Sequence, residues 1–170
     1  DDLIPQQVSM ATVQRVLQTL LSERVSIRDL PTILEGIAET AGRAHTAMIM
    51  TEHVRTRLAR QISRAVTNHK GLLPLIALSP QWEQAFAESI IGQGEERQLA
   101  MAPSKLQEFI GAVRRAFDGA SMDGETPVLL TSPSVRPFVR SLVERFRPTT
   151  FVMSQAEVHA SAKLKSMGQI

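Results

Sequence analysis

The sequence predicts an α+β protein: an N-terminal three-helix unit followed by a small α/β unit with a three- to four-stranded, largely parallel sheet. Up to about residue 68 the apolar residues recur at helical spacing, and from Gly71 onward short apolar runs alternate with helical patterns. We therefore expect a helical subdomain over 1–70 and an α/β subdomain over 71–170, with a polar tail from about residue 159. Neither part is clearly large enough to fold alone, so the two are expected to share an interface.

Composition limits the classes of function. The chain has 170 residues, 43% of them apolar, and carries 19 Lys and Arg against 17 Asp and Glu, a net charge of +2. The absence of cysteine excludes disulfides, Cys-ligated zinc and thiol nucleophiles. The longest apolar run, Leu72–Leu78, is far below the roughly 20 residues of a membrane span, so the chain itself is expected to be soluble. It begins with Asp-Asp rather than Met, which we interpret as a fragment of a longer protein.

Three helices are predicted in the first half. The first begins after Ser9, a suitable N-cap, and its buried stripe comprises Val13, Val16, Leu17, Leu20 and Leu21. The second reaches Ala41 and repeats the pattern with Ile27, Leu30, Ile33, Leu34, Ile37 and Ala38. The third starts near Thr46 or Thr51, ends by Asn68 and buries Val54, Leu58, Ile62, Ala65 and Val66.

The corner between the first two helices carries local capping signals. Ser26 and Asp29 have the spacing of a capping box, and Val25 has the spacing that packs on Leu30. Either Ser26 starts the helix after an irregular turn, or Asp29 is the cap and Pro31 lies in the first turn, where proline is tolerated. Such a corner is typical of helices that present a rigid face, which favours a module that assembles or docks.

Strand-then-helix units are predicted in the second half. Leu72–Leu78 and Val128–Thr131 are apolar runs too short for helices, and each is followed by Ser-Pro, at Ser79 and Ser132, which is a helix-opening signal. A third strand over Phe151–Ser154 follows closely, so parallel strands are the default. Between the units the pattern predicts an edge strand over Gln98–Ala102 and a helix with the stripe Leu106, Phe109, Ile110, Val113 and Phe117.

Catalytic and metal-binding chemistry finds little support. A strand-to-helix junction can bind an anion, but the glycines that let a phosphate approach the backbone are missing at Ser79 and Ser132, so both serines are predicted to be N-caps. No Gly-x-Ser-x-Gly elbow occurs, and Glu95-Glu96 is interpreted as an exposed turn. No metal-ligand spacing connects the histidines, which are His45, His53, His69 and His159. We predict no catalytic residue, metal or cofactor.

The best surface feature is a basic side of the third helix. His53, Arg57, Arg60 and Arg64 recur at i, i+4, i+7 and i+11, so they line one side. This side could bind an acidic partner protein or nucleic acid, or it could be a solvated face paired with neighbouring glutamates. Trp82, in the first turn of its helix, is interpreted as core, with partial exposure and partner anchoring as the alternative.

The helix corner also permits a helix-turn-helix, nucleic-acid-binding interpretation. Two observations oppose it. The second helix is mostly core-facing, and its exposed positions include Glu35 and Glu39, which repel phosphate. We therefore keep this interpretation as the alternative of another class and expect no nucleic acid among the partners.

Several longer segments carry a resemblance to a known family. The most specific are VSIRDL at Val25–Leu30 and VLLTSPSVRP at Val128–Pro137. The wider blocks are RVLQTLLSERVSIRDLPTILEGIAE, TEHVRTRLARQI, LPLIALSP, PVLLTSPSVRPFVRSLVERF and TFVMSQAEV. Together, from about Leu3 to Val158 and in the family's order, they resemble the C-terminal cytoplasmic part of the flagellar member of the export-gate family. Flagellar and virulence type III secretion systems share this family.

The resemblance implies a non-enzymatic component of the flagellar protein export gate. Family members have an N-terminal transmembrane region and four cytoplasmic subdomains, which form a homo-oligomeric ring and receive export substrates, chaperones and ATPase-complex components. This chain resembles the third and fourth subdomains. It is therefore expected at the cytoplasmic face of the bacterial inner membrane, attached only through the N-terminal region it lacks. The family's main chaperone cleft belongs to the first two subdomains, so no residue here inherits it.

One alternative within the family stays open, because an export-gate homologue of a virulence type III secretion system has the same architecture. The chain also departs from the family near its end. Ser154-Gln155-Ala156-Glu157 replaces a serine-tyrosine-asparagine-glutamate stretch, and the tail over His159–Ile170 lacks the usual apolar final strand. No strand is therefore predicted for the tail.

Overall fold

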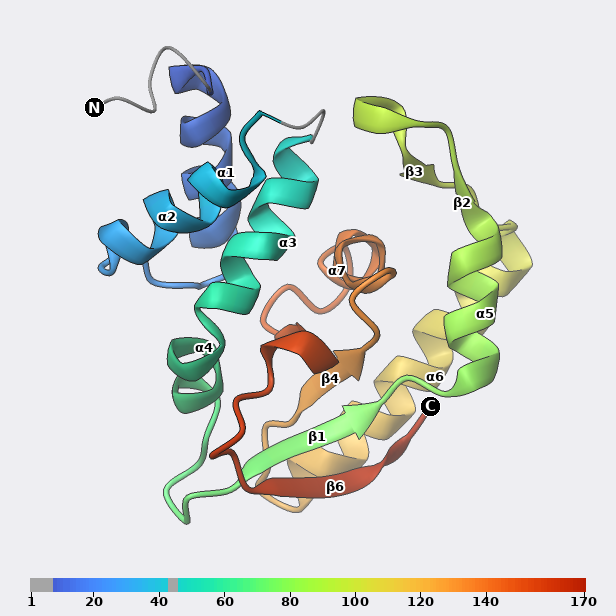
Figure 1. Cartoon of the computed structure of the whole chain (residues 1–170). Helices are drawn as coiled ribbons and strands as arrows, with labels where there is room; N and C mark the ends of the chain where they lie inside the picture. Colours follow the sequence, from blue (N-terminus) through green and yellow to red (C-terminus); the bar gives the residue numbers. More distant parts are fainter. Residues whose placement is uncertain (1–7, 43–45) are drawn as a thin grey trace.

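The computed structural model describes residues 8–42 and 46–170. Within these ranges a four-stranded sheet has helices on both faces (Figure 1). The helices of the N-terminal half are α1 (Met10–Ser22), α2 (Leu30–Thr40), α3 (Ala47–Arg57) and α4 (Ala59–Ala65). Those of the C-terminal half are α5 (Pro80–Ser89), α6 (Pro103–Met122) and α7 (Arg136–Val143). Two short 3-10 turns are η1 (Gly94–Glu96) and η2 (Gln155–Glu157).

The corner between α1 and α2 shows which residue caps the second helix. The Asp29 carboxylate accepts the backbone N–H three residues on at 3.2 Å, so the helix begins at Leu30 and Pro31 lies in its first turn. Ser26 is not the cap, because its hydroxyl accepts the N–H only two residues on, at 3.2 Å. With Asp29 as the cap, Val25 and Leu30 no longer stand at the staple positions predicted for them, and Leu30 is 41% exposed.

The third predicted helix is two helices. Thr46 caps α3 by accepting the N–H of Ile49 at 3.1 Å, but the helix ends at Arg57. Leu58 has φ −94° and ψ 15°, and α4 begins directly after it. The break allows the Ser63 hydroxyl of α4 to donate to the carbonyl of Glu157 at 3.0 Å, which joins α4 to η2.

The sheet has the strand order β5-β4-β1-β6, and every neighbouring pair is parallel. Leu75 lies opposite Val128, and Leu129 lies opposite Val152. The parallel β4-α7-β5 connection agrees with the prediction. The bounds are β1 (Leu73–Ala77), β4 (Val128–Thr131), β5 (Val152–Ser154) and β6 (Leu164–Gln169).

The edge of the sheet differs from the prediction. Its outer strand next to β1 is β6, from the tail for which no strand was predicted. The predicted edge strand instead gives β3 (Gln98–Leu99), which pairs antiparallel with β2 (Ile90–Ile91) in a separate ribbon. The β6 segment has no apolar run, so only the free edge of β1 makes it a strand.

Each face of the sheet has its own apolar core. Leu75, Val128 and Met153 pack with the N-terminal helices, whereas the adjacent residues Ile76 and Leu129 pack with α5, α6 and α7. Successive side chains of a strand point to opposite faces, so the N-terminal helices pack on one face of β1, β4 and β5, and α5, α6 and α7 pack on the other. The two halves therefore share a core across the predicted boundary at 68–71.

Candidate functional site

A cluster of buried charged side chains lies where the two halves meet. Arg55 on α3 and Arg136 at the start of α7 are both 0% exposed, and Glu157 of η2 is 1% exposed. A charge without solvent must be paired, because its desolvation is otherwise too costly. We call the following six residues the junction cluster: Glu23, Glu52, Arg55, Arg136, Arg140 and Glu157.

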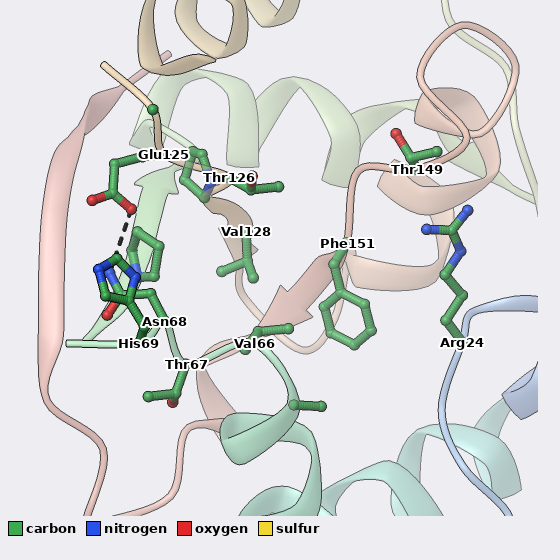
Figure 2. Close-up of a pocket in the computed structure, with 14 residues that line it drawn as sticks. Arg24, Val66, Thr67, Asn68, His69, Glu125, Thr126, Val128, Thr149 and Phe151 are labelled. Atoms are coloured by element: carbon green, nitrogen blue, oxygen red, sulfur yellow. Dashed lines mark hydrogen bonds between the residues drawn. The ribbon is translucent and has the colours of Figure 1, made fainter. Parts of the chain in front are cut away.

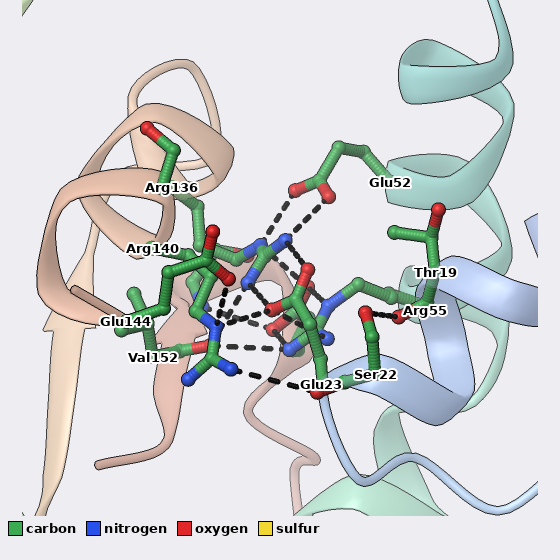
Figure 3. Close-up of polar contacts among 12 residues, drawn as sticks. Thr19, Ser22, Glu23, Glu52, Arg55, Arg136, Arg140, Glu144 and Val152 are labelled. Atoms are coloured by element: carbon green, nitrogen blue, oxygen red, sulfur yellow. Dashed lines mark hydrogen bonds and ion pairs between the residues drawn. The ribbon is translucent and has the colours of Figure 1, made fainter. Parts of the chain in front are cut away.

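Arg136 uses all five of its N–H donors (Figure 3). Its Nε and Nη2 donate to the two oxygens of Glu52 at 2.7 and 2.8 Å. Its Nη1 and Nη2 donate to the two oxygens of Glu23 at 2.7 and 3.0 Å, and Nη1 also reaches the carbonyl of Val152 at 3.1 Å. The guanidinium therefore joins the end of α1, the middle of α3 and strand β5.

Arg55 makes the second set of connections. Its Nε and Nη2 donate to the two carboxylate oxygens of Glu157 at 2.7 and 3.0 Å, and its Nη2 donates to the carbonyl of Val152 at 3.2 Å. The same Glu157 carboxylate accepts the backbone N–H of Ser154 at 3.0 Å. Phe151 lies against the guanidinium, 5.4 Å from it to the ring centroid. The turn after β5 is thus held against α3.

Arg140 closes the cluster from the next turn of α7. Its Nη1 donates to the carbonyls of Pro148 and Thr150 at 3.3 and 3.2 Å, and its Nη2 reaches the carbonyl of Ser22 at 3.5 Å. Its Nε lies 4.0 Å from a carboxylate oxygen of Glu23. The last turn of α1 is therefore attached to the α7–β5 loop.

The electrostatics of the cluster favour the charged forms of Glu23 and Arg136. Burial alone would raise the pKa of the Glu23 carboxyl, but the charge and hydrogen bonds of Arg136, with Arg55 and Arg140 nearby, hold that pKa below its usual value. Burial would likewise lower the pKa of Arg136, but Glu52 and Glu23 raise it instead. Three arginines face three glutamates, so the arrangement suits holding elements together rather than transferring protons.

The basic side predicted on the third helix is partly neutralised. His53 Nε2 lies 2.6 Å from a carboxylate oxygen of Glu39, and Arg57 pairs with both Glu39 and Glu35 of α2. Arg60 and Arg64 stay exposed and line a shallow groove together with Arg57. The structure therefore brings Arg57, Arg60 and Arg64 together, and His53 is connected to Arg57 through Glu39. The two glutamates that were expected to repel phosphate pair with His53 and Arg57.

Trp82 is core rather than a partly exposed anchor. It is 8% exposed, and its ring packs edge-on against Phe109 with centroids 5.0 Å apart. Lys105 lies over the ring, 4.9 Å from its centroid. The interpretation as a partner anchor therefore loses the exposed aromatic surface that it required.

The two Ser-Pro junctions differ. Ser79 caps α5 by accepting the backbone N–H of Trp82 at 3.3 Å. Ser132 caps nothing, because α7 begins only at Arg136. The backbone N–H and hydroxyl of Ser132 donate to the Glu83 carboxylate at 2.8 and 2.6 Å. A carboxylate of the chain itself thus occupies the position that an anion would take.

A groove of about 500 Å³ lies beside the sheet (Figure 2). Figure 2 shows Val66 and Phe151 between Arg24 on one side and His69 on the other. Glu125 at its rim is held by Lys165 at 2.9 Å and Asn68 at 3.4 Å, and the Lys165 hydrogen bond lowers its pKa. Among residues 8–42 and 46–170 no three His, Asp or Glu side chains form a metal site; His45 lies outside the described residues.

Similarity to known proteins identifies the family. The sequence matches the FHIPEP family over residues 1–163. The chain belongs to this family. Flagellar biosynthesis protein FlhA of Caulobacter vibrioides is 58% identical over all 170 residues, which are 24% of its own length. The chain thus spans about a quarter of the curated relatives it matches. The predicted resemblance to the C-terminal cytoplasmic region of export-gate proteins is confirmed.

Solved structures of type III export-gate proteins share the fold of the FHIPEP chain. The Chlamydia pneumoniae CdsV protein superposes with a TM-score of 0.88 at 28% identity, covering 99% of this chain and 47% of that one. CdsV is also known in complex with the CdsO protein, at TM-score 0.84 and 27% identity, covering 99% and 48%. A nonameric EscV cytosolic domain of a type III secretion system gives TM-score 0.84 at 27% identity, covering 99% and 49%. No helix among the described residues is long and apolar enough to cross a membrane.

The junction cluster was not predicted from the sequence. Thr51, Arg55, Leu58 and Ile62 recur at i, i+4, i+7 and i+11, so Arg55 lies within a buried stripe of the helix pattern. A charged residue inside an apolar stripe is a signal for a buried ion pair. Its partner Glu157 is 102 residues away, and no local pattern connects the two.

Proposed function

We propose that this chain is part of the flagellar protein export gate, at the cytoplasmic face of the bacterial inner membrane. In this proposal it has no catalytic role and contributes surfaces for a ring and for docking of export substrates, chaperones and ATPase-complex components. The observation that carries the proposal is the 58% identity to a flagellar FlhA over the whole chain. Membership of the FHIPEP family over residues 1–163 supports it.

The junction cluster explains how such a module would work. Docking surfaces assembled from several elements need those elements at fixed distances, since each loose element must be ordered at binding. Arg136 and Arg55 join α1, α3, β5 and the turn after it through buried charged hydrogen bonds. Among relatives of this fold, the EscV cytosolic domain is described as a nonamer and CdsV as a complex with the CdsO protein.

A flagellar rather than a virulence role is favoured by the degree of identity. The flagellar protein of Caulobacter vibrioides is 58% identical, whereas CdsV and EscV, of the same fold, are 28% and 27% identical. The virulence homologue is the second candidate function. The operon that contains the gene decides between them, because flagellar genes lie next to other flagellar genes and injectisome genes next to other injectisome genes.

The nucleic-acid-binding alternative has weaker support. It needs an exposed, positively charged helix face, but Glu35 and Glu39 of α2 pair with Arg57 and His53. A gel-shift experiment at low salt tests it directly. Salt-dependent retention of duplex DNA would favour this alternative, and the export-gate proposal expects none.

A strain with an in-frame deletion of the codons for the 170 residues of this chain tests the export-gate proposal. We expect loss of swimming and of secreted filament protein, with both restored by a plasmid copy of the intact gene. Immunoblots of the membrane fraction show whether the shortened protein is still present. Normal swimming and secretion in the deletion strain would contradict the proposal.

The basic side of α3 and α4 is one proposed contact surface. Arg60 and Arg64 are exposed there, and Arg57 is shared with Glu35 and Glu39. Charge reversal at Arg57, Arg60 and Arg64 is expected to weaken pull-down of export-apparatus partners and to reduce motility. Arg28→Glu, an exposed arginine outside this groove, is the matched control. Unchanged pull-down and motility in the triple variant would remove this surface from the proposal.

A further inference from the structure

Another groove lies between the β2–β3 ribbon, the start of α6 and helix α7. Its volume is about 350 Å³. Leu99 comes from the ribbon, Met101 and Leu106 from the segment that enters α6, and Met48 from the first turn of α3. Met48 is 36% exposed, and the other three are half-buried. The floor therefore offers apolar surface at a place where helical and α/β halves meet.

The charges around this groove have one sign. Its charged lining residues are Arg97 of the ribbon and Arg145 after α7, and no acidic residue lines it. Within the described part of the chain, neither guanidinium has a carboxylate oxygen within 4.0 Å. The adjacent groove next to α1 is different, because four glutamates there balance Arg15, Arg136 and Arg140.

Arg97 and Arg145 are therefore placed to receive negative charge. The Arg97 guanidinium lies over the ring of Phe138, 5.2 Å from its centroid, which holds it at the groove wall. Arg145, two residues after the end of α7, is exposed and lines the same groove. An apolar floor between two arginines without acidic partners complements a peptide that has apolar side chains on one face and carboxylates beside them.

The ribbon wall is held in position at its tip. Glu95 accepts the backbone N–H of Ala47 at 3.3 Å and pairs with Arg15 at 3.2 Å. The loop at the tip begins with Gly92, directly after β2; it has φ +84°, and a Cβ there would lie 2.5 Å from the carbonyl oxygen of Glu96. The tight turn and the tip contacts together keep the ribbon at the side of the groove rather than across it.

We propose that this groove docks an acidic amphipathic segment of a partner protein. The inference rests on the proposed function in taking that partner from among the proteins that the export gate handles. Leucine-type side chains of the segment enter between Leu99 and Leu106, and its carboxylates pair with Arg97 and Arg145. Neither contact requires a change in the junction cluster.

A fluorescein-labelled helical peptide of Leu and Glu, with Leu at i, i+3, i+4 and i+7, is the probe. Fluorescence anisotropy with the full 170-residue chain is expected to show saturable binding that weakens with salt. R97E/R145E is expected to weaken binding about tenfold or more, and Met48→Gln to weaken it less. Arg28→Glu, which removes an exposed arginine elsewhere, is expected to leave binding unchanged. Circular dichroism melting checks that all variants are folded.

Three outcomes would overturn the inference. The first is equal binding of the peptide by R97E/R145E and Arg28→Glu, and the second is equal binding of a probe with Lys in place of Glu. The third is sedimentation showing that the chain self-associates through this groove and that R97E/R145E abolishes the association, since a second copy would then be the occupant. The deletion strain tests the export role, and the peptide measurements test the groove. A negative result in one experiment therefore does not imply a negative result in the other, and the two proposals can be contradicted separately.

Discussion

Arg136 shows what a single buried side chain contributes to this fold. Each of its five donors has an acceptor, and those acceptors come from α1, α3 and β5. The guanidinium and its carboxylate partners stabilise the fold only together, because removing either side leaves the other buried without its counter-charge. The loss of one partner therefore costs more than the intact group contributes.

Arg136→Ala is expected to lower the free energy of unfolding by about 3–5 kcal/mol, because it leaves Glu23 and Glu52 facing each other without the guanidinium. Urea unfolding measures the loss. Arg28→Ala removes an exposed arginine and is expected to change stability by less than about 0.5 kcal/mol.

The same experiment includes a partial rescue. Adding Glu52→Gln to Arg136→Ala is expected to recover some of the lost stability, because among the described residues Glu52 pairs only with Arg136, whereas Glu23 keeps Arg55 and Arg140 nearby. A loss below about 1 kcal/mol in Arg136→Ala, or no recovery in the double variant, would mean that the cluster does not hold the halves together.

Glu23 is expected to make stability depend on pH. Its pKa in the folded chain is lower than the ordinary value of 4.5, so its charged form stabilises the fold above that pH, and this contribution is lost as pH falls through the folded pKa. The stability difference between wild type and Glu23→Gln should therefore be largest at neutral pH and shrink below 4.5. Glu108→Gln, on the exposed face of α6, should give no such trend. Parallel curves for wild type and Glu23→Gln would contradict the assignment.

At the residue scale the caps were easier to predict than the charges. Ser9, Thr46 and Ser79 lie at N-caps as their types suggest, because a cap depends on a hydrogen bond to an N–H only a few residues away. The prediction that Ser132 is an N-cap was wrong, because this serine donates its hydrogen bonds to a carboxylate distant in the sequence, that of Glu83. The junction cluster was missed for the same reason: its partners are distant in sequence.

At the scale of elements, the β2–β3 ribbon is the part most dependent on backbone geometry. Its strands contribute two paired residues each, Ile90 with Leu99 and Ile91 with Gln98. Such a short ribbon has few hydrogen bonds of its own and relies on its turn and its tip contacts. The turn residue Gly92 has φ +84°, a conformation that side-chain-bearing residues rarely adopt.

Gly92→Ala is expected to destabilise the ribbon by more than about 1–2 kcal/mol, since strain at positive φ adds to the close approach of Glu96. Gly119→Ala is the matched variant. Gly119 lies inside α6 with no atom near the added Cβ, so the substitution should stabilise the helix by about 0.5–1 kcal/mol. Hydrogen exchange of amides 90–99 and urea unfolding report both effects. Unchanged exchange in Gly92→Ala would show that the turn is not the constraint.

Element prediction succeeded where the pattern was long and failed where tertiary pairing decides. The 20-residue helix α6 follows its apolar stripe throughout. Strand β6 has the sequence Leu-Lys-Ser-Met-Gly-Gln, which contains neither an apolar run nor strict alternation. Its strand conformation comes from pairing with β1, and Leu73 lies opposite Leu164. Such a strand cannot be recognised until its neighbour is placed.

At the scale of the whole molecule, the two halves are joined twice. One face of the sheet packs on the N-terminal helices through Leu75, Val128 and Met153. Beside that apolar contact, the junction cluster ties α1 and α3 to α7 and η2. The central claim is that these two contacts make the described residues, 8–42 and 46–170, a single cooperative unit, which gives its docking surfaces a fixed geometry. The family resemblance predicted two subdomains but not how tightly they are joined.

Urea unfolding followed by two probes tests this claim most directly. Trp82, the only tryptophan in the sequence, reports on the α/β half, and circular dichroism at the helix minimum reports on both halves with much of its signal from α1–α4. The account predicts that the fluorescence and dichroism transitions coincide in wild type and separate in Arg136→Ala. Separate transitions in wild type would show that the halves unfold independently and would contradict the claim.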